Sequence, residues 1–153
     1  MTLHLLRGGA THGALALTSS PEQGREVLTD DVEFSGPALA LAESSPHRLI
    51  YATPELTAPV HISGTVSVTV RLASSKAAAN LSVWLVQVPW TEGPISPANL
   101  ITRGWADPQN HRSLTKGGNY DARAAGEPLA PGQFVTLTFD LQPDEIRMKE
   151  KSE

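Results

Sequence analysis

The stretch Ile101–Tyr120 concentrates the side chains of this sequence that could carry chemistry. Asp107 and His111 are close enough for a carboxylate to orient an imidazole, and Ser113 could supply a nucleophilic hydroxyl. All three would lie on one loop, however, and a precise catalytic geometry needs support from rigid elements. We therefore interpret the stretch as a turn held by its own hydrogen bonds, with Asp107 at its start and Asn110 as a capping residue.

Other signatures of catalysis or ligand binding are absent from the sequence. It contains no G-x-S-x-G nucleophile elbow, no H-E-x-x-H zinc motif, no phosphate-binding lysine loop and no EF-hand loop. The glycine-rich segment Gly8–Gly13 has no lysine and no helix behind it, which favours a hairpin turn. The five histidines are not spaced as metal ligands and there are no cysteines, so we predict no metal, no cofactor and no disulfide.

Aromatic and charged side chains in and around the same stretch could bind a sugar or a protein surface. Sugar-binding jelly rolls stack pyranose rings on aromatic side chains, which here would be those of Trp84, Trp90, Trp105 and Tyr120. Opposite charges mixed with aromatic rings are also typical of a polar interface between domains. The residues that we predict to form an interface or to anchor the loop are Arg103, Trp105, Asp107, Asn110, Arg112, Lys116 and Tyr120. The side chains expected to pack beneath the loop are those of Trp105, Leu114, Tyr120 and Leu129.

Short strands are expected to position these side chains. His61–Leu72 and Phe134–Leu141 alternate apolar and polar residues, which predicts strands with one wet face. Leu81–Val88 is apolar on both faces, which suits a central strand or one whose outer face meets another domain. Val27–Leu41 is ambiguous. Further strands are predicted at Leu3–Leu6, Ala14–Thr18, His47–Thr53 and Asn99–Trp105.

This pattern predicts an all-β fold with few helices. No segment keeps a 3.6-residue apolar period, and many short strands joined by Gly/Pro turns favour a jelly-roll-like antiparallel β-sandwich of the galactose-binding-domain-like type. A chain of 153 residues fits one domain. We assign it to residues 1–143 and expect residues 144–153 to form a charged tail or a short exposed helix.

Composition and charge argue against several classes of partner. The net charge is −4 and no lysine or arginine cluster forms a stripe, which argues against nucleic-acid binding. No apolar run approaches the roughly 18 residues that a membrane-spanning helix needs, so no membrane association is expected. We expect no signal peptide and a cytoplasmic location, in agreement with the absence of cysteines.

Several segments resemble a known family. "HRLIYATPELTAPVHISG", with the strand-forming residues that follow it, is similar to the start of the C-terminal domain of Xaa-Pro dipeptidyl-peptidases and cocaine-esterase-like serine hydrolases. The family positions in this segment are those of Leu49, Tyr51, Thr53, Leu56 and Gly64. "LITRGWADPQNHRSLTKGGNY" and "EPLAPGQFVTLTFDLQPDE" resemble the bacterial Xaa-Pro dipeptidyl-peptidase branch. The resemblance is strong from Arg48 to Asp144 and looser from Thr2 to Pro46.

The resemblance implies a non-catalytic role for this chain. In such cytoplasmic serine exopeptidases, an upstream α/β-hydrolase domain carries the nucleophile, the aspartate and the histidine, and removes X-Pro dipeptides from peptide N-termini. The C-terminal jelly-roll β-sandwich packs on that domain, and the parent enzymes are typically homodimers. The chain on its own is therefore expected to be inactive.

The sequence also departs from the family pattern near its end. The family continues with further strands, including a G-x-R-x-G-L segment, whereas here a charged stretch follows Asp144. We therefore expect a piece cut at both ends, with a sandwich that lacks its last strands and compensates by dimerising or exchanging strands. Two other interpretations stay open, namely a carbohydrate-binding jelly-roll module and an assembly or adhesion module.

Overall fold

The computed structural model of the chain describes residues 1–87, 100–115 and 126–148. These residues form mostly short strands, with one α-helix and one 3₁₀ turn among them, which confirms the predicted all-β fold with few helices. No helix within these ranges is long and apolar enough to cross a membrane. The chain divides into two compact units, which we describe separately. The first unit comprises Met1–Val60, Val88–Ser96 and Lys149–Glu153, and the second comprises His61–Gln87 and Pro97–Met148.

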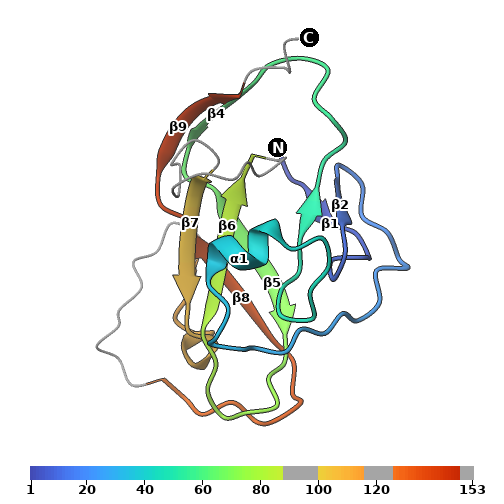
Figure 1. The fold of residues 1–153 in the computed structure, drawn as a ribbon. Helices are drawn as coiled ribbons and strands as arrows, with labels where there is room; N and C mark the ends of the chain where they lie inside the picture. The colour runs from blue at the N-terminus through green and yellow to red at the C-terminus, as the bar shows by residue number, and fades with distance from the viewer. Residues whose placement is uncertain (88–99, 116–125, 149–153) are drawn as a thin grey trace. The chain divides into compact units, whose positions relative to one another are not determined.

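The first unit contains a three-stranded sheet (Figure 1). Strand β1 (His4–Leu5) pairs antiparallel with β2 (Gly13–Ala16), and β2 pairs parallel with β3 (Tyr51–Ala52). Strand β1 lies within the predicted range Leu3–Leu6, whereas β2 begins one residue before the predicted range Ala14–Thr18 and ends two residues before its end. The glycine-rich segment, whose last residue Gly13 begins β2, connects β1 to β2 as expected of a hairpin turn, and Thr11 N donates to Gly8 O at 3.0 Å.

The strand predicted at His47–Thr53 is regular only at its end. The residue before β3 bonds to the segment Gly8–Gly13, which we call the glycine loop. Ile50 N donates to Gly9 O (2.7 Å), and Gly13 N donates to Ile50 O (2.9 Å). A Cβ at Gly13 would overlap the ring of Tyr51, so only glycine permits this close approach.

The ambiguous stretch Val27–Leu41 ends in the only regular helix of the described residues, α1 (Gly36–Leu41). Ser35 caps this helix, since its Oγ accepts a hydrogen bond from Ala38 N (3.4 Å), and Pro37 lies in the first turn. A helix of six residues is too short to be stable by itself, and none of its residues is buried. Contacts outside the helix must therefore hold it.

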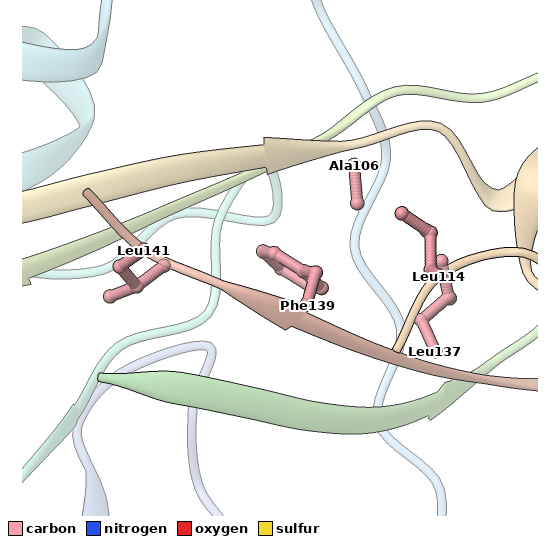
Figure 2. Packing of buried hydrophobic residues seen from close by; sticks show 5 residues of the cluster. All are labelled: Ala106, Leu114, Leu137, Phe139 and Leu141. Carbon is pink, nitrogen blue, oxygen red and sulfur yellow. The ribbon is translucent and has the colours of Figure 1, made fainter. Parts of the chain in front are cut away.

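The second unit is a small sandwich. Strand β5 (Ser67–Leu72) pairs antiparallel with β8 (Val135–Asp140), and β6 (Leu81–Val86) pairs antiparallel with β7 (Leu100–Ala106). Buried side chains from β7, β8 and the residues that follow these two strands meet in one core, as Figure 2 shows for Ala106, Leu114, Leu137, Phe139 and Leu141. Partly buried side chains that pack against it are those of Val66, Val68, Val70, Leu72, Leu81, Val83, Leu85 and Val135. The predicted inward alternation is thus confirmed, while the jelly-roll order of strands stays a prediction.

The structure differs from two predictions near the ends of the second unit. The strand predicted at His61–Leu72 is divided into β4 (Val60–Gly64) and β5, because Gly64 adopts a φ of 96° that turns the chain. Residues Asp144–Met148 form strand β9 beside β4 instead of a tail or helix. The partner strand offers backbone hydrogen bonds that outweigh the weak strand propensity of charged residues.

Strand β7 lies against the segment that leaves β8. A Cβ at Gly104 would come within 2.8 Å of Leu141 Cδ2, so the absence of a side chain there allows the approach. Thr102 Oγ1 donates to Gln142 O at 2.6 Å, and Gln142 N donates to Arg103 O at 2.9 Å. These contacts fix the position of β7.

Candidate interaction surface

The outward face of the β6–β7 pair carries two of the predicted interface residues. The register places Ser82 opposite Trp105 and Trp84 opposite Arg103. Core-facing positions alternate with these along both strands, so the four side chains point away from the core. We call Ser82, Trp84, Arg103 and Trp105 the outer patch.

Trp105 is exposed, and the expectation that it anchors the loop by burial is wrong. Its side chain is 54% exposed, because the neighbouring positions Gly104 and Ala106 face the core and Trp105 must alternate with them. The Arg103 guanidinium lies over its ring at 5.0 Å, in cation–π geometry. Trp84 Nε1 donates to Ser82 Oγ at 3.0 Å. The outer patch therefore combines apolar rings with one positive charge.

Aliphatic side chains anchor the loop instead. Leu114 and Leu129 are buried, as predicted, and Leu129 N donates to Ala77 O at 2.8 Å. Lys116 and Tyr120, which the sequence also assigns to the interface or to loop anchoring, lie outside the described residues.

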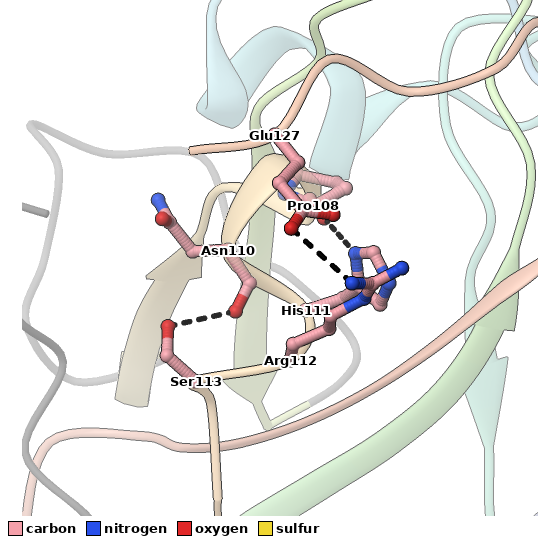
Figure 3. A network of polar contacts seen from close by, with 6 residues as sticks. All are labelled: Pro108, Asn110, His111, Arg112, Ser113 and Glu127. Atoms are coloured by element: carbon pink, nitrogen blue, oxygen red, sulfur yellow. Dashed lines mark hydrogen bonds and ion pairs between the residues drawn. The ribbon is translucent and has the colours of Figure 1, made fainter. Parts of the chain in front are cut away.

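The residues after β7 form the predicted turn (Figure 3). Asn110 N donates to Asp107 O (2.9 Å), and a 3₁₀ turn spans Pro108–Asn110. The main-chain carbonyl of Asn110 accepts from Ser113 N (2.9 Å) and from Ser113 Oγ (3.0 Å). With the Asn80 amide in the orientation that suits its neighbours, Asn80 Nδ2 donates to Asp107 Oδ1 at 2.7 Å.

These bonds are those of a structural turn. The Ser113 hydroxyl, the candidate nucleophile, donates to a main-chain carbonyl, and His111 Nδ1 lies 3.0 Å from Pro108 O. A catalytic serine would instead direct its hydroxyl to the imidazole. The observed bonds agree with the interpretation of the stretch as a non-catalytic turn.

An ion pair joins the two described sides of this loop. Arg112 Nη1 lies 3.2 Å from Glu127 Oε1, and both side chains are exposed. Glu127 N also donates to Gln109 O at 2.9 Å. Exposed pairs of this kind contribute about 0–1 kcal/mol to stability, so the backbone bond and the buried leucines hold the loop.

The first unit contains a carboxylate clamp that sequence reasoning missed. Glu26 Oε1 accepts from Gly8 N (2.9 Å) and Gly9 N (2.7 Å), and Tyr51 Oη donates to Glu26 Oε2 (2.7 Å). Burial alone raises the pKa of the Glu26 carboxyl, but these three hydrogen bonds and the charge of Arg7 bring it below its ordinary value. Burial and the Glu26 charge raise the pKa of Tyr51. Two adjacent glycine N–H groups are the sequence signal that could have indicated an anion site.

Arg48 holds the same loop through its carbonyls. Partial burial lowers the pKa of the Arg48 guanidinium. The guanidinium donates hydrogen bonds to five main-chain carbonyls. The acceptors are the carbonyl oxygens of Leu39, Ala42, Gly9, Ala10 and Thr11. The Glu26 carboxylate therefore accepts from the N–H groups of the glycine loop, and the Arg48 guanidinium donates to its carbonyls. Arg48 also donates to carbonyls of α1 and of the residue that follows it.

Comparisons with known proteins converge on one family. The family model described as X-Pro dipeptidyl-peptidase C-terminal non-catalytic domain matches residues 3–150. A Rhodopirellula baltica protein named "Putative Xaa-Pro dipeptidyl-peptidase" is 47% identical over 140 residues, which cover 90% of this chain and 21% of that protein. Proteins with the same name from Bacillus cereus and Streptomyces avermitilis are 32% and 27% identical over 67% and 84% of the chain.

The matched region is a small part of each relative. It spans 15% of the Bacillus cereus protein and 23% of the Streptomyces avermitilis protein. No solved structure matches the chain. Within the described residues, no group of three or more His, Asp or Glu side chains is placed to hold a metal ion.

Proposed function

Because the chain belongs to the family of X-Pro dipeptidyl-peptidase C-terminal non-catalytic domains, we propose that it is the accessory β-sandwich of a longer X-Pro dipeptidyl-peptidase. In this proposal it packs on an α/β-hydrolase domain that removes X-Pro dipeptides from peptide N-termini. The observation that carries the proposal is the family match over residues 3–150. The 21% share of the Rhodopirellula baltica relative supports a polypeptide that extends well beyond this chain.

The geometry of the turn supports a role outside the chemistry. Ser113 and His111 bond to main-chain carbonyls, so neither is arranged as a nucleophile or as its base. Arg103 and Trp105 are proposed to contribute to the contact with the hydrolase domain, because Trp105 is exposed, Arg103 lies over its ring, and Trp and Arg are enriched in interface hot spots.

The proposal is tested with an X-Pro-p-nitroanilide substrate. The full-length polypeptide is expected to release nitroaniline, and the purified chain alone is expected to release none. In the full-length polypeptide, Ser113→Ala and His111→Ala are expected to keep kcat/KM within about twofold, because neither residue takes part in the reaction. Hydrolysis by the chain alone, or no hydrolysis by the full-length polypeptide, would contradict the proposal.

Carbohydrate binding is the second candidate function, and the exposed indole of Trp105 favours it. Arg103 lies over this ring, yet Trp105 remains 54% exposed, so part of its surface is accessible for stacking on a sugar. Trp90 and Tyr120, the other rings that could join such a platform, lie outside the described residues. Glycan binding by the chain that is lost in Trp105→Ala would establish this function, and no binding across a glycan array would remove it.

A homodimeric parent enzyme in the cytoplasm completes the proposal. The family resemblance supports the dimer, and the absence of cysteines agrees with a reducing compartment. Light scattering of the full-length polypeptide measures the mass of the assembly, and fractionation of the producing cells tests the location.

A further inference from the structure

One segment of the first unit combines negative charge with exposed apolar side chains. We call residues 27–43 the acidic-apolar segment. It carries the carboxylates of Asp30, Asp31, Glu33 and Glu43 and contains no lysine or arginine. These four negative charges equal the formal net charge of the whole chain, −4, so the remaining residues balance to zero.

Large apolar side chains in this segment face solvent. Val32 is 89% exposed and Val27 is 66% exposed, and the other exposed members are Leu28, Phe34 and Leu41. Helix α1, which ends the apolar part of the segment, buries none of its residues. Single apolar residues are normal on a surface, but five exposed ones within fifteen consecutive positions concentrate apolar surface in this segment.

The segment is nevertheless held in place. Thr29 N donates to Pro46 O (2.7 Å), and His47 Nδ1 lies 2.8 Å from Thr29 O. The Phe34 ring stacks on the His47 ring with centroids 4.8 Å apart, and Arg48 donates to Leu39 O at 3.0 Å. Polar bonds and one ring contact therefore order an apolar surface before any partner covers it, which reduces the entropic cost of binding.

We infer that the acidic-apolar segment docks on the remainder of the longer polypeptide, into an apolar depression rimmed by lysine or arginine. This inference rests on the proposed function. The matched region is 21% of the Rhodopirellula baltica relative, so most of such a polypeptide is available as the partner. The four carboxylates select a positively charged rim.

A second copy of the chain fits this surface less well. A two-fold interface brings the same patch of each copy together. Here it would place two sets of four carboxylates against each other, with no positive side chain in the segment to offset them. Like charges facing each other across an interface disfavour association.

Thiol labelling of the full-length polypeptide tests the inference, because this chain has no cysteines of its own. Val32→Cys reports on the segment. Leu17→Cys is the matched control, since Leu17 is also an apolar first-unit residue and is 69% exposed, but lies outside the segment. The rate of alkylation at each position is measured by peptide mass mapping in native buffer and in urea.

The thiol at position 32 is expected to react at least about tenfold more slowly in native buffer than in urea, while the thiol at position 17 changes by less than about threefold. In the purified chain alone, both thiols are expected to react rapidly. Equal labelling at both positions in the full-length polypeptide would overturn the inference. So would slow labelling at position 32 in the chain alone, because the chain or a second copy would then cover the segment.

Charge reversal tests the rim. Glu33→Lys, added to Val32→Cys, is expected to raise the labelling rate at position 32 at least about threefold more in the full-length polypeptide than in the chain alone, where the new lysine acts only on the neighbouring thiol. Glu55→Lys, an exposed control outside the segment, is expected to leave that rate unchanged. Equal labelling rates at position 32 in the Glu33→Lys and Glu55→Lys variants would overturn the inference that lysine or arginine side chains line the docking site.

The substrate assay separates the inference from the proposed function. Cleavage of X-Pro-p-nitroanilide together with unprotected position 32 rejects the docking surface alone. Protection of position 32 without cleavage rejects the proposed activity and retains the docking surface.

Discussion

The two units of the chain are stabilised by different kinds of interaction. Among the described residues, the buried hydrophobic side chains all belong to the second unit, with Leu137 and Phe139 at 0% and 3% exposure. In the first unit, Glu26 and Arg48 bond to main-chain groups of the glycine loop, and large apolar side chains remain exposed.

The buried side chains of the second unit stabilise the fold, whereas the exposed apolar side chains of the first unit form part of the surface. Fully burying a large apolar side chain contributes about 1.5–3 kcal/mol, whereas a typical hydrogen bond contributes about 0.5–1.5 kcal/mol net. The second unit therefore contains its own source of stability. The first unit is ordered by polar contacts and leaves large apolar side chains exposed.

Truncation of equivalent aromatic residues should show the largest difference between the units. Phe139→Ala is expected to lower the free energy of unfolding by about 3–5 kcal/mol, because it opens a cavity in the core. Phe34→Ala removes an exposed ring that contacts His47 and is expected to cost less than about 1 kcal/mol. Urea denaturation of both variants measures the two values, and similar losses would contradict the contrast.

The carboxylate clamp should give an intermediate effect. Glu26→Ala removes the acceptor of the Gly8 N–H, the Gly9 N–H and the Tyr51 hydroxyl, and is expected to destabilise the first unit by about 1–3 kcal/mol. Hydrogen exchange should show faster exchange at the Gly8 and Gly9 amides, with little change in the β5–β8 ladder. Unchanged exchange at both glycines would show that the clamp does not order the loop.

Glu26 should also make the first unit sensitive to acid. Its folded-state pKa lies below the ordinary value of 4.5, so ionisation favours the folded state. The stabilisation is complete above the unfolded pKa and is lost as the pH falls through the folded pKa. The advantage of the wild type over Glu26→Gln, measured by urea denaturation from pH 7 to pH 3, should therefore shrink below about pH 4.5. An advantage that is constant with pH would contradict this assignment.

The outer patch should contribute little to the stability of the chain. Trp105→Ala is expected to cost less than about 1 kcal/mol, since it removes an exposed ring and one cation–π contact. The same substitution should lower the urea midpoint of the full-length polypeptide further if the ring lies in a domain interface. A loss of about 3–5 kcal/mol in the chain alone would instead indicate a buried anchor.

The smallest effect is expected for the exposed ion pair. Arg112→Ala should change the free energy of unfolding by no more than about 0.5 kcal/mol, and the change should disappear in 1 M salt. Thermal unfolding at low and high salt measures it, with Arg112→Lys as the control that keeps the charge.

The apolar–polar alternation of the sequence predicted the strands that bury one face and expose the other. The alternation in Ser67–Leu72 and Val135–Asp140 identified both strands and their inward faces, because one buried face imposes a period of two. The expectation that Trp105 is buried did not use this alternation. The register of β7 directs Trp105 outward, and register depends on pairing with β6.

Long-range contacts explain what the sequence did not reveal. Charged residues at Asp144–Met148 form β9 because β4 lies beside them, and Glu26 meets a loop 17 residues earlier in the chain. Neither contact gives a periodic pattern in the sequence, because each joins two segments that only folding brings together.

The sequence by itself determined the all-β class, the main strands of the second unit, the absence of recognisable catalytic motifs and the family resemblance. These properties depend on residue types and short spacings. The tertiary structure alone decided which side chains face outward, how Glu26 and Arg48 grip the glycine loop, and which apolar residues are left exposed. Burial and hydrogen bonding are properties of segments in contact, and that contact exists only in the folded chain.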